Sequence, residues 1–431
     1  MPDPAPLTVL FMPESAYGPT NNCIGIGNVL QGRGHRVVFA AEASWEGKLT
    51  ALGFEEELVH LAPVPDEPQD AGQFWKDFIR ETAPEFRKPT IQQLDTWVKP
   101  VWEELIGGAR YCEPQLRDII ARTAPDVIVE DNVVSFPALV TAGKPFVRIV
   151  SCNPLELKGA AVAPTFSGHP AADQSEWTAF RAEYERTHRA LWADFNAWVI
   201  EQGAPPLADL EFVHDGDLNL YVYPEELDYV ADRPLGPSWH RLESSVRRTD
   251  TPVELPAMLT DRPEGSALIY FSLGSLGSAD VKLMRRVISA LAQTPHRYIV
   301  SKGPLHEELV LAPNMWGAEF LPQTAILPLV DLVITHGGNN TTTEAMHFGV
   351  PMIVLPLFWD QYDNAQRVDE TGFGVRLDPY RFTDSQMQKA IRALLTDGGL
   401  QARLAAASAR IQAADGLHRA AALIESAAHP A

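Results

Sequence analysis

Residues 316–367 read WGAEFLPQTAILPLVDLVITHGGNNTTTEAMHFGVPMIVLPLFWDQYDNAQR, and this stretch decides the fold of the second half of the chain. An apolar run from Asp331 to His336 predicts a strand, and the small residues from Gly337 to Asn340 predict a tight turn. A helix is expected to begin near Thr341. This order predicts a phosphate site, because free N–H groups and the positive end of a helix face the turn.

Polar side chains cluster around this predicted turn. His336 stands at the end of the strand, and the hydroxyls of Thr341 and Thr342 add donors. Upstream, Ser272 and Ser275 follow another apolar strand in FSLGS, so they can reach the same phosphates. Downstream, the pair Asp360–Gln361 follows the strand PMIVLP, and a carboxylate beside an amide suits a grip on neighbouring sugar hydroxyls.

The rest of the chain repeats the alternation of strand and helix. LTVLFM (Leu7–Met12) and HRVVFAA (His35–Ala41) predict two strands, joined by a loop over Ser15–Asn22 and a helix over Ile24–Gln31. This is a βαβ unit with a parallel sheet. A Pro-rich segment then separates the two α/β halves. We expect one α/β domain over 1–235, a linker over 236–264, a second α/β domain over 265–415 and a C-terminal helix or tail over 416–431, and the resemblance described below implies that the first domain binds an acceptor and the second a nucleotide sugar.

Taken together, the motifs of residues 316–367 resemble the C-terminal signature of the family-one glycosyltransferases with the GT-B fold. The matching patterns are F-x-P-Q, T-H-x-G, an acid eight residues after the His, G-V-P and D-Q-x-x-N-A. Arg33–Val37 (RGHRV) and Leu235–Pro237 (LGP) extend the resemblance over nearly the whole chain, and favour the bacterial macrolide and antibiotic branch over the related plant UDP-glucosyltransferases. The resemblance implies a GT-B fold, in which two Rossmann-like βαβ domains face each other across a cleft.

The resemblance also implies a role for each matching residue. Phe320 would stack on the base, Gln323 would lie near the base or ribose, and Glu344 would hold the ribose hydroxyls. Asp360 and Gln361 would hold the sugar, which favours UDP-glucose over a related UDP- or TDP-sugar as donor; no bound cofactor is implied. The diphosphate would be held by His336, Gly338, Asn340, Thr341 and Thr342, together with Ser275.

The N-terminal half departs from the family at the residue that activates the acceptor. Relatives use a His in the loop after the first strand, oriented by an Asp after a later strand. Asp131 ends the predicted strand PDVIVED and fits the orienting acid, but the loop ESAYGPTNN contains no His, and Pro19 stands at the expected position. His35 belongs to the structural RGH motif, so we interpret it as a packing residue.

Three interpretations of this departure stay open. Asp131 acts directly as the base, helped by Glu14 or Tyr17, and an acidic phenol or enol would suit a carboxylate base best. Alternatively, the acceptor needs little activation, as an amine would, or another loop supplies the base, for which His169 is a candidate. In the third interpretation, the chain has lost catalysis and only binds nucleotide sugars.

Composition excludes several other classes of protein. The formal charge of −21 disfavours nucleic acid as a partner. The three cysteines, Cys23, Cys112 and Cys152, give no disulfide framework or zinc site, and the chain lacks a signal peptide and a membrane-spanning run, so a cytoplasmic location is expected. Asp215-Gly216-Asp217 matches the D-x-D pattern that holds a metal in other glycosyltransferases, but we interpret it as a surface turn and expect no metal.

These observations predict a UDP-dependent hexosyltransferase. We expect metal-independent, inverting transfer of a hexose to a small hydrophobic natural product, by a monomer or homodimer. The competing hypotheses are a non-catalytic nucleotide-sugar-binding helper and a nucleotide-sugar epimerase. Aromatic residues in two presumed insertions are more often core than ligand contacts, but any that face the cleft would favour an apolar acceptor. They are Phe74, Trp75, Trp97, Trp102 and Phe166.

Overall fold

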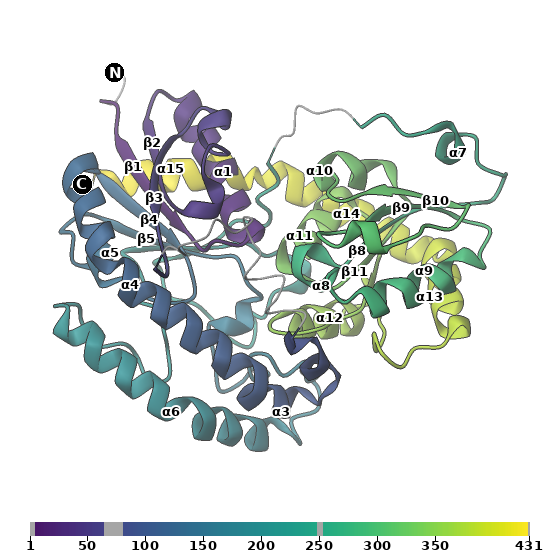
Figure 1. Cartoon of the computed structure of the whole chain (residues 1–431), viewed down its shortest axis with the longest axis horizontal. Coiled ribbons are helices and arrows are strands. Elements are labelled where there is room, and N and C mark those ends of the chain that lie inside the picture. Colours follow the sequence, from purple (N-terminus) through teal and green to yellow (C-terminus); the bar gives the residue numbers. More distant parts are fainter. Residues whose placement is uncertain (1–4, 64–80, 248–252, 430–431) are drawn as a thin grey trace.

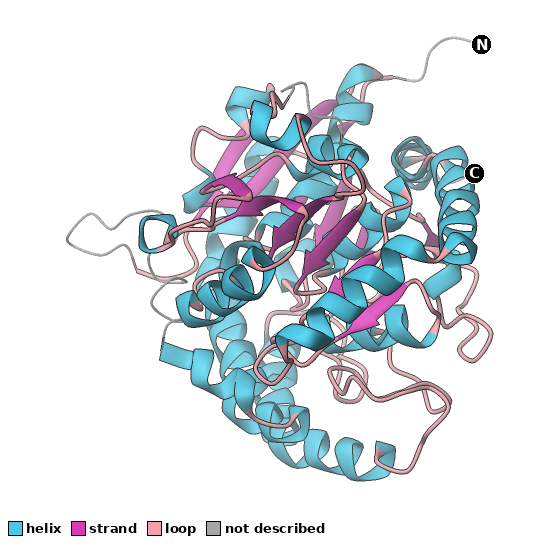
Figure 2. Cartoon of the chain, turned by 90° about the vertical axis from the view of Figure 1, so that its right-hand side faces the viewer, coloured by secondary structure: helices cyan, strands magenta, loops and turns pink. Residues whose placement is uncertain are grey.

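The computed structural model describes residues 5–63, 81–247 and 253–429, which form two α/β domains side by side (Figure 1). Each domain has a single parallel sheet with helices packed on both faces (Figure 2). The predicted α/β class is therefore confirmed. Phe74 and Trp75 lie outside the described residues.

The N-terminal sheet has seven strands in the order β3-β2-β1-β4-β5-β6-β7. Its strands alternate sides: Val9 and Phe11 point toward α1, whereas Leu10 and Met12 belong to the core on the other face. Both faces are buried, as a parallel sheet requires. The strands are β1 (Thr8–Pro13), β2 (Arg36–Glu42), β3 (Glu55–Val59), β4 (Val127–Asp131), β5 (Phe146–Val150), β6 (Leu218–Tyr221) and β7 (Trp239–Arg241).

The C-terminal sheet has six strands in the order β10-β9-β8-β11-β12-β13. The order reverses beside β8, which pairs with β9 on one side and β11 on the other, and such a switch point opens a crevice at the carboxyl ends of the strands. The strands are β8 (Leu268–Ser272), β9 (Arg297–Ser301), β10 (Met315–Ala318), β11 (Leu332–Thr335), β12 (Met352–Val354) and β13 (Gly374–Arg376).

The helices connect the strands and line the space between the domains. Those of the N-terminal domain are α1 (Tyr17–Gly32), α3 (Thr90–Gln93), α4 (Lys99–Thr123), α5 (Pro137–Val140) and α6 (Trp177–Glu201). Those of the C-terminal domain are α7 (Ala257–Thr260), α8 (Gly274–Gly277), α9 (Val281–Ala292), α10 (Gln323–Ile326), α11 (Asn339–Phe348), α12 (Gln361–Glu370), α13 (Asp384–Thr396) and α14 (Gly398–Ala414). The last helix is α15 (Gly416–Ala428).

Helix α1 begins earlier than the sequence predicts. The loop expected to continue to Asn22 ends at Ala16, and α1 starts at Tyr17. The prediction was wrong because Gly18 and Pro19 are typical of turns. In the first turn of a helix, however, the missing N–H of a proline has no helical partner to lose. The segment aligned with the catalytic loop of relatives is therefore mostly helical.

The last helix returns to the N-terminal domain. Asp415 has a left-handed backbone (φ 46°), and this residue separates α14 from α15. Helix α15 packs along α1, where Glu425 pairs with Arg33 and accepts a hydrogen bond from Nε2 of His35 at 2.8 Å. The Nδ1 atom of His35 also accepts the N–H of Leu7. His35 is thus a structural residue, as expected from its motif.

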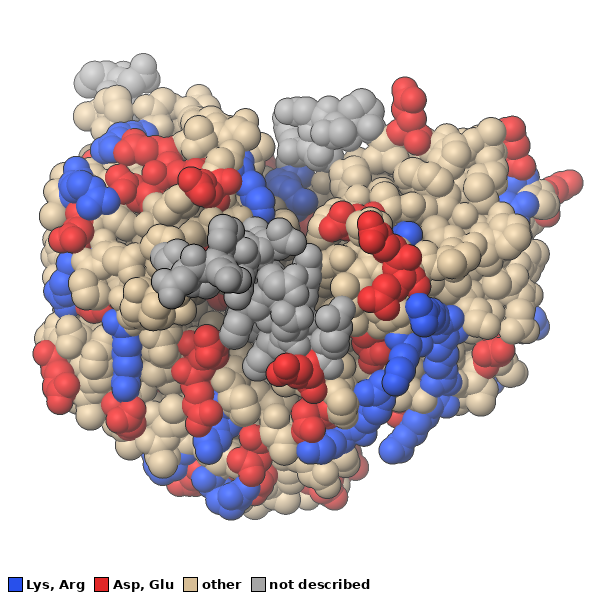
Figure 3. Space-filling view, viewed as in Figure 1, with Lys and Arg blue, Asp and Glu red and all other residues tan. Residues whose placement is uncertain are grey.

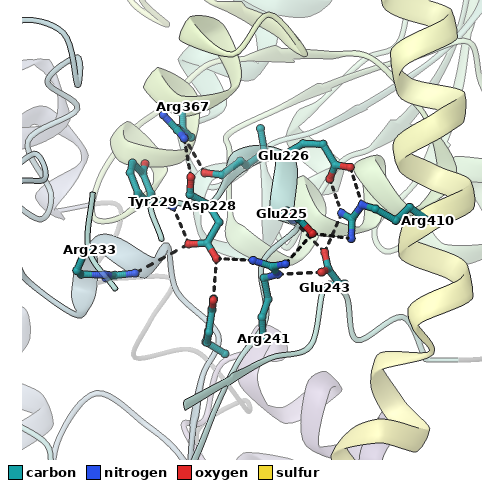
Figure 4. A network of polar contacts seen from close by, with 11 residues as sticks. Glu225, Glu226, Asp228, Tyr229, Arg233, Arg241, Glu243, Arg367 and Arg410 are labelled. Carbon is teal, nitrogen blue, oxygen red and sulfur yellow. Dashed lines mark hydrogen bonds and ion pairs between the residues drawn. The ribbon is translucent and has the colours of Figure 1, made fainter. Parts of the chain in front are cut away.

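An ionic network joins the two domains (Figure 4). Arg410 of α14 contacts Glu226 at 2.5 Å and Glu243 at 2.9 Å. Glu243 lies in the predicted linker, but it follows β7 and therefore belongs to the N-terminal sheet domain, which extends further than the sequence predicts. Arg367 of α12 donates to the carbonyl oxygens of Leu227 and Asp228. Because both arginines come from the C-terminal domain and all four partners from the other, the network fixes the orientation of the domains.

Charge is unevenly distributed on the surface. On the face shown in Figure 3, acidic side chains form separate groups, and a band of Lys and Arg side chains crosses the lower right of the view. Within the described ranges, every helix is either too short or too polar to span a bilayer.

Candidate active site

The candidate site lies where the carboxyl ends of the two sheets face each other. Asn153, which follows β5, donates its N–H to Asp360 Oδ2 at 2.9 Å, and its side-chain amide donates to Asn364 Oδ1 at 2.9 Å. Asp360 and Asn364 belong to the start of α12, so a loop of one domain bonds directly to a helix of the other. This places the predicted residues of both domains on one cleft.

At the phosphate end, the ring of His336 is packed between two glycines. A Cβ atom at Gly274 or Gly338 would lie only 2.7 Å or 2.6 Å from atoms of this ring. Gly274 also has a positive φ of 71°, which glycine adopts without strain. Burial lowers the pKa of His336 to about 4, so the imidazole is neutral at pH 7 and can donate one hydrogen bond to a diphosphate.

Helix α11 begins at Asn339, two residues earlier than expected, and its first turn faces this imidazole. Asn340 bonds across the cleft, donating to the carbonyl oxygen of Gly18 at 3.0 Å and accepting from Asn22 at 3.1 Å. Thr342 donates back to Gly338 O. In this structure, the side chains of Asn340 and Thr342 therefore have protein partners, and the first-turn N–H groups of α11 are the principal donors for a phosphate. Ser275 lies in α8, beside Gly274.

At the ribose end, three predicted residues bond to one another. The amide of Gln323 donates to Glu344 Oε2 at 2.6 Å and to Thr341 Oγ1 at 3.1 Å. Burial raises the pKa of Glu344, while Arg247 lies 3.7 Å from its other oxygen. The carboxylate is thus held in place by an amide and a cation, an arrangement that suits the two hydroxyls of a ribose.

At the base end, Phe320 is half exposed and faces Tyr17 of the other domain. The two ring centroids are 6.1 Å apart, and Tyr17 also packs on Trp45 at 5.2 Å. Tyr17, predicted as a helper of Asp131, therefore packs against Trp45 and Phe320. Exposed rings of this kind suit a flat base that stacks beside them.

At the sugar end, Asp360 and Gln361 have different surroundings. Burial raises the pKa of Asp360 to about 7, although Asn153 and Asn364 both donate to its Oδ2 atom. The side-chain oxygen of Gln361 accepts the N–H groups of Leu357 and Phe358, which leaves its NH₂ group to face a ligand. No role was predicted for Asn153 or Asn364 from the sequence. The D-Q-x-x-N spacing places Asn364 one helical turn after Asp360, and this spacing could have indicated its role.

Asp131 ends β4 and is almost completely buried. Ser151 donates to its Oδ1 atom, and its Oδ2 atom has no hydrogen-bond partner among the described residues. Burial raises the pKa of Asp131 to about 8, and the neighbouring carboxylates of Glu156 and Glu14 add to the shift. Glu14 is adjacent, because its N–H donates to the carbonyl oxygen of Asp131 at 2.8 Å, while its carboxylate accepts the N–H of Ala16 before α1.

His169, the alternative base, lies elsewhere in the acceptor domain. Its ring packs edge-on against Phe180 of α6, with centroids 5.5 Å apart, and burial lowers its pKa. The loop that carries His169 is bound to Asp363 of α12 through the N–H of Gly168. These contacts place the imidazole against a helix of the core and give it no bond to Asp131.

The D-x-D sequence forms a turn at the amino end of β6. Asp215 pairs with Arg148 at 2.9 Å, and Asp217 accepts the N–H of Phe146 at 2.9 Å. Since the strands are parallel, this turn is at the edge of the sheet opposite to Asp131. No group of three or more acidic, His or Cys side chains in the described part of the chain is arranged to hold a metal ion.

Comparisons with known proteins find similarity to glycosyltransferases. Residues 248–408 match the family described as UDP-glucoronosyl and UDP-glucosyl transferase. The chain is 26% identical to NDP-glycosyltransferase YjiC of Bacillus subtilis, covering 95% of this chain and 94% of the relative. It is 27% identical to the oleandomycin glycosyltransferase of Streptomyces antibioticus, covering 97% and 90%. The crystal structure of the kitacinnamycin glycosyltransferase superposes with a TM-score of 0.71 at 22% identity, covering 98% and 99%.

Proposed function

We propose that this chain, a member of the family-one glycosyltransferases with the GT-B fold, transfers glucose from UDP-glucose to a small hydrophobic natural product with inversion and without a metal ion. The family, its fold and its bacterial antibiotic-related branch agree with the resemblance seen in the sequence. The donor sugar, the stereochemistry, the absence of a metal and the cytoplasmic location belong to the proposal.

The observation that carries the proposal is a three-residue segment shared by both halves of the site. Ser151 donates to Asp131, and Asn153 donates to Asp360. The Cα atoms of Ser151 and Asn153 are at most roughly 7.6 Å apart, because consecutive Cα atoms are about 3.8 Å apart. A candidate base and a candidate sugar-binding carboxylate thus lie on either side of one short segment, where an acceptor and a donor sugar have to meet.

The proposed reaction is a single displacement at the anomeric carbon. The acceptor oxygen forms a bond to this carbon while the bond from the carbon to the diphosphate oxygen breaks, and Asp131 Oδ2 takes the acceptor proton. The raised pKa makes Asp131 a stronger base than an ordinary carboxylate. The charge that develops on the diphosphate is stabilised by the start of α11 and the neutral imidazole of His336.

We infer that Asp131 takes the role of the His that relatives carry and that the segment Glu14–Asn22 lacks. Among the described residues, its Oδ2 atom is buried without a partner, whereas His169 is packed against Phe180. Of the three interpretations left open by the sequence, direct base catalysis by Asp131 therefore has the most support. None of the contacts between described residues specifically favours a helper or an epimerase.

A transfer assay tests the proposal. The protein is incubated with UDP-glucose, EDTA and a panel of phenols, macrolides and amines, and added hexose is detected by mass. We expect glucosylation of a phenol in the presence of EDTA, with the β-linkage that inversion of UDP-α-glucose gives. UDP binding without transfer to any acceptor would favour the helper function instead.

The donor sugar has its own test in Asp360→Ala. We expect the KM for UDP-glucose to rise about tenfold or more, because a buried carboxylate that bonds sugar hydroxyls is lost. The dissociation constant for UDP serves as the control and should stay unchanged, since UDP carries no sugar at this position. An unchanged KM would show that Asp360 serves only the domain contact with Asn153.

A further inference from the structure

Aromatic side chains from both domains meet across the cleft. Phe358 and Trp359 belong to the loop between β12 and α12. The ring of Trp359 lies with its centroid 4.4 Å from that of Phe166 and 5.2 Å from that of Trp102, both of the N-terminal domain. Phe358 packs on Trp97 at 5.2 Å. Two consecutive rings of the donor-binding domain are therefore inserted among rings of the acceptor domain.

The two rings that touch are both carried on left-handed backbone. Phe166 has φ 68° and Trp359 has φ 57°, and nearby Leu210 has φ 57°. Among the described residues, six non-glycine residues have a positive φ, and half of them belong to this region. Bulky residues rarely adopt this conformation. The cases that occur are concentrated at ligand-binding sites.

A specific contact enforces this backbone at Phe166. Asp363 in the first turn of α12 accepts the N–H of Phe166 at 2.6 Å and the N–H of Gly168 at 2.8 Å. Trp359 stands four residues before Asp363 and contacts the same loop from the other side. Contacts between the domains thus hold Phe166 and Trp359 in the left-handed conformation. Separation of the domains would let both residues leave it.

Phe166 forms part of the wall of a small cavity in the acceptor domain, and Trp359 packs on this wall residue. Its walls include Trp102, Phe166, Tyr184 and Phe212, and its volume is about 10 Å³, room for no more than one water molecule. Trp102 and Phe212 are stacked, with centroids 4.4 Å apart and planes at 19°. The rings themselves fill the space, so a ligand can enter only if these rings move.

The cavity adjoins the segments that carry the two candidate carboxylates. Val133, two residues after Asp131, lines it. Trp359, which directly precedes Asp360, packs on the wall residues Phe166 and Trp102. Glu156 also lines it, and its charge raises the pKa of both Asp131 and Asp360, after burial. A ring bound here would present a hydroxyl to Asp131 beside the donor sugar.

We propose that Trp359 and Phe166 determine the acceptor specificity of the enzyme, and that the acceptor is a flat, unsaturated ring system that replaces their contacts with each other and with Trp102. This inference rests on the proposed function and names the class of its acceptor. A planar ring can reproduce aromatic contacts with centroids 4.4–5.2 Å apart, whereas a puckered saturated ring of the same skeleton cannot stack.

The test compares 2-naphthol with decahydro-2-naphthol, which share a carbon skeleton and a hydroxyl but differ in planarity. Dissociation constants are measured by calorimetry in the presence of UDP. We expect the wild type to bind 2-naphthol about tenfold more tightly, as expected for an aromatic contact. In Trp359→Leu and in Phe166→Leu, which keep an apolar side chain and remove the ring, the preference should fall below about twofold. Trp359→Phe should restore most of it.

Two controls separate specificity from folding and strain. The dissociation constant for UDP should stay unchanged in every variant, which shows that the donor domain is intact. Ala124→Gly relaxes another left-handed residue, at the end of α4 and outside the cleft, and should leave both naphthol affinities unchanged.

The proposal is overturned if the wild type does not discriminate between the naphthols, or if both leucine variants keep the wild-type ratio. Binding is measured without transfer, so this result is independent of whether glucose moves. A preference for 2-naphthol without any transfer would refute the proposed function and leave the ring-selective site standing.

Discussion

The donor-binding and acceptor-binding halves of the cleft are built in opposite ways. In the C-terminal domain, Gln323 bonds to both Thr341 and Glu344, and Gln361 accepts the N–H of Leu357 in the preceding loop. In the N-terminal domain, Asp131 Oδ2 is buried without a partner among the described residues. The donor site is therefore pre-organised. The acceptor site contains a buried polar atom without a hydrogen-bond partner and residues with strained backbone, and a bound substrate can supply the hydrogen bond and relieve the strain.

The largest expected effect comes from a substitution that removes the candidate base of the acceptor half and leaves the donor half intact. Asp131→Asn should lower kcat on the order of a thousandfold, because the general base is lost. The matched control is Glu130→Gln, the neighbouring carboxyl on the opposite face of β4, which should leave kcat unchanged. Activity within tenfold of wild type in Asp131→Asn would refute direct base catalysis.

The next effect is a pH dependence confined to the acceptor half. Because the pKa of Asp131 is raised to about 8, the carboxyl is protonated below that pH, and the base form appears as pH rises through it. The value of kcat/KM for a phenol should therefore increase by about 90-fold between pH 6 and pH 9. UDP affinity, measured at the same pH values, should not follow this curve. A profile that is flat between pH 7 and pH 9 would contradict the assignment.

A smaller effect probes the donor half. Glu344→Ala should weaken UDP binding about tenfold, since a buried carboxylate that bonds the ribose is removed. Thymidine diphosphate, which lacks the 2′-hydroxyl, is the internal comparison and should be weakened less. Equal losses for both nucleotides would show that Glu344 holds Gln323 and Thr341 in place without reading the ribose.

The smallest effect concerns the link between the halves. Arg410→Ala should destabilise the protein by about 1 kcal/mol, because a partly exposed ion pair contributes little even in a network. We expect a fall of about 2 °C in Tm. Arg392→Ala, an exposed arginine on α13, is the control and should leave Tm unchanged. A loss several times larger would mean that the domains do not stay docked without Arg410.

The donor half could be predicted from the sequence because its residues come from one segment of the chain. The order of strand, small residues and helix around His336 is local, and the structure reproduces it with α11 starting two residues early. The fold class followed from the repeated alternation of apolar strands and helices. No ligand contact tests the individual roles of Phe320, Glu344 or Asp360, which remain predictions.

The acceptor half could not be predicted in the same way. Phe166 and Trp359 are far apart in the sequence, and neither is a residue type that signals left-handed backbone. The raised pKa of Asp131 depends on burial by surrounding elements, which spacing along the chain does not reveal. The segment Ser15–Asn22 was predicted as a loop, but most of it belongs to α1. The prediction was wrong because Pro19 is equally compatible with a turn and with the first turn of a helix.

The return of α15 to the N-terminal domain restricts how this enzyme can be recombined with its relatives. A hybrid made by exchanging everything after the linker would also exchange the helix that covers α1, including Glu425 and its bonds to Arg33 and His35. Leu417 would be exchanged as well, and it lies so close to Gly25 that a Cβ there would be 2.9 Å from it. A working chimera therefore needs two junctions, one in the linker and one near Asp415, so that the last helix stays with the domain it covers.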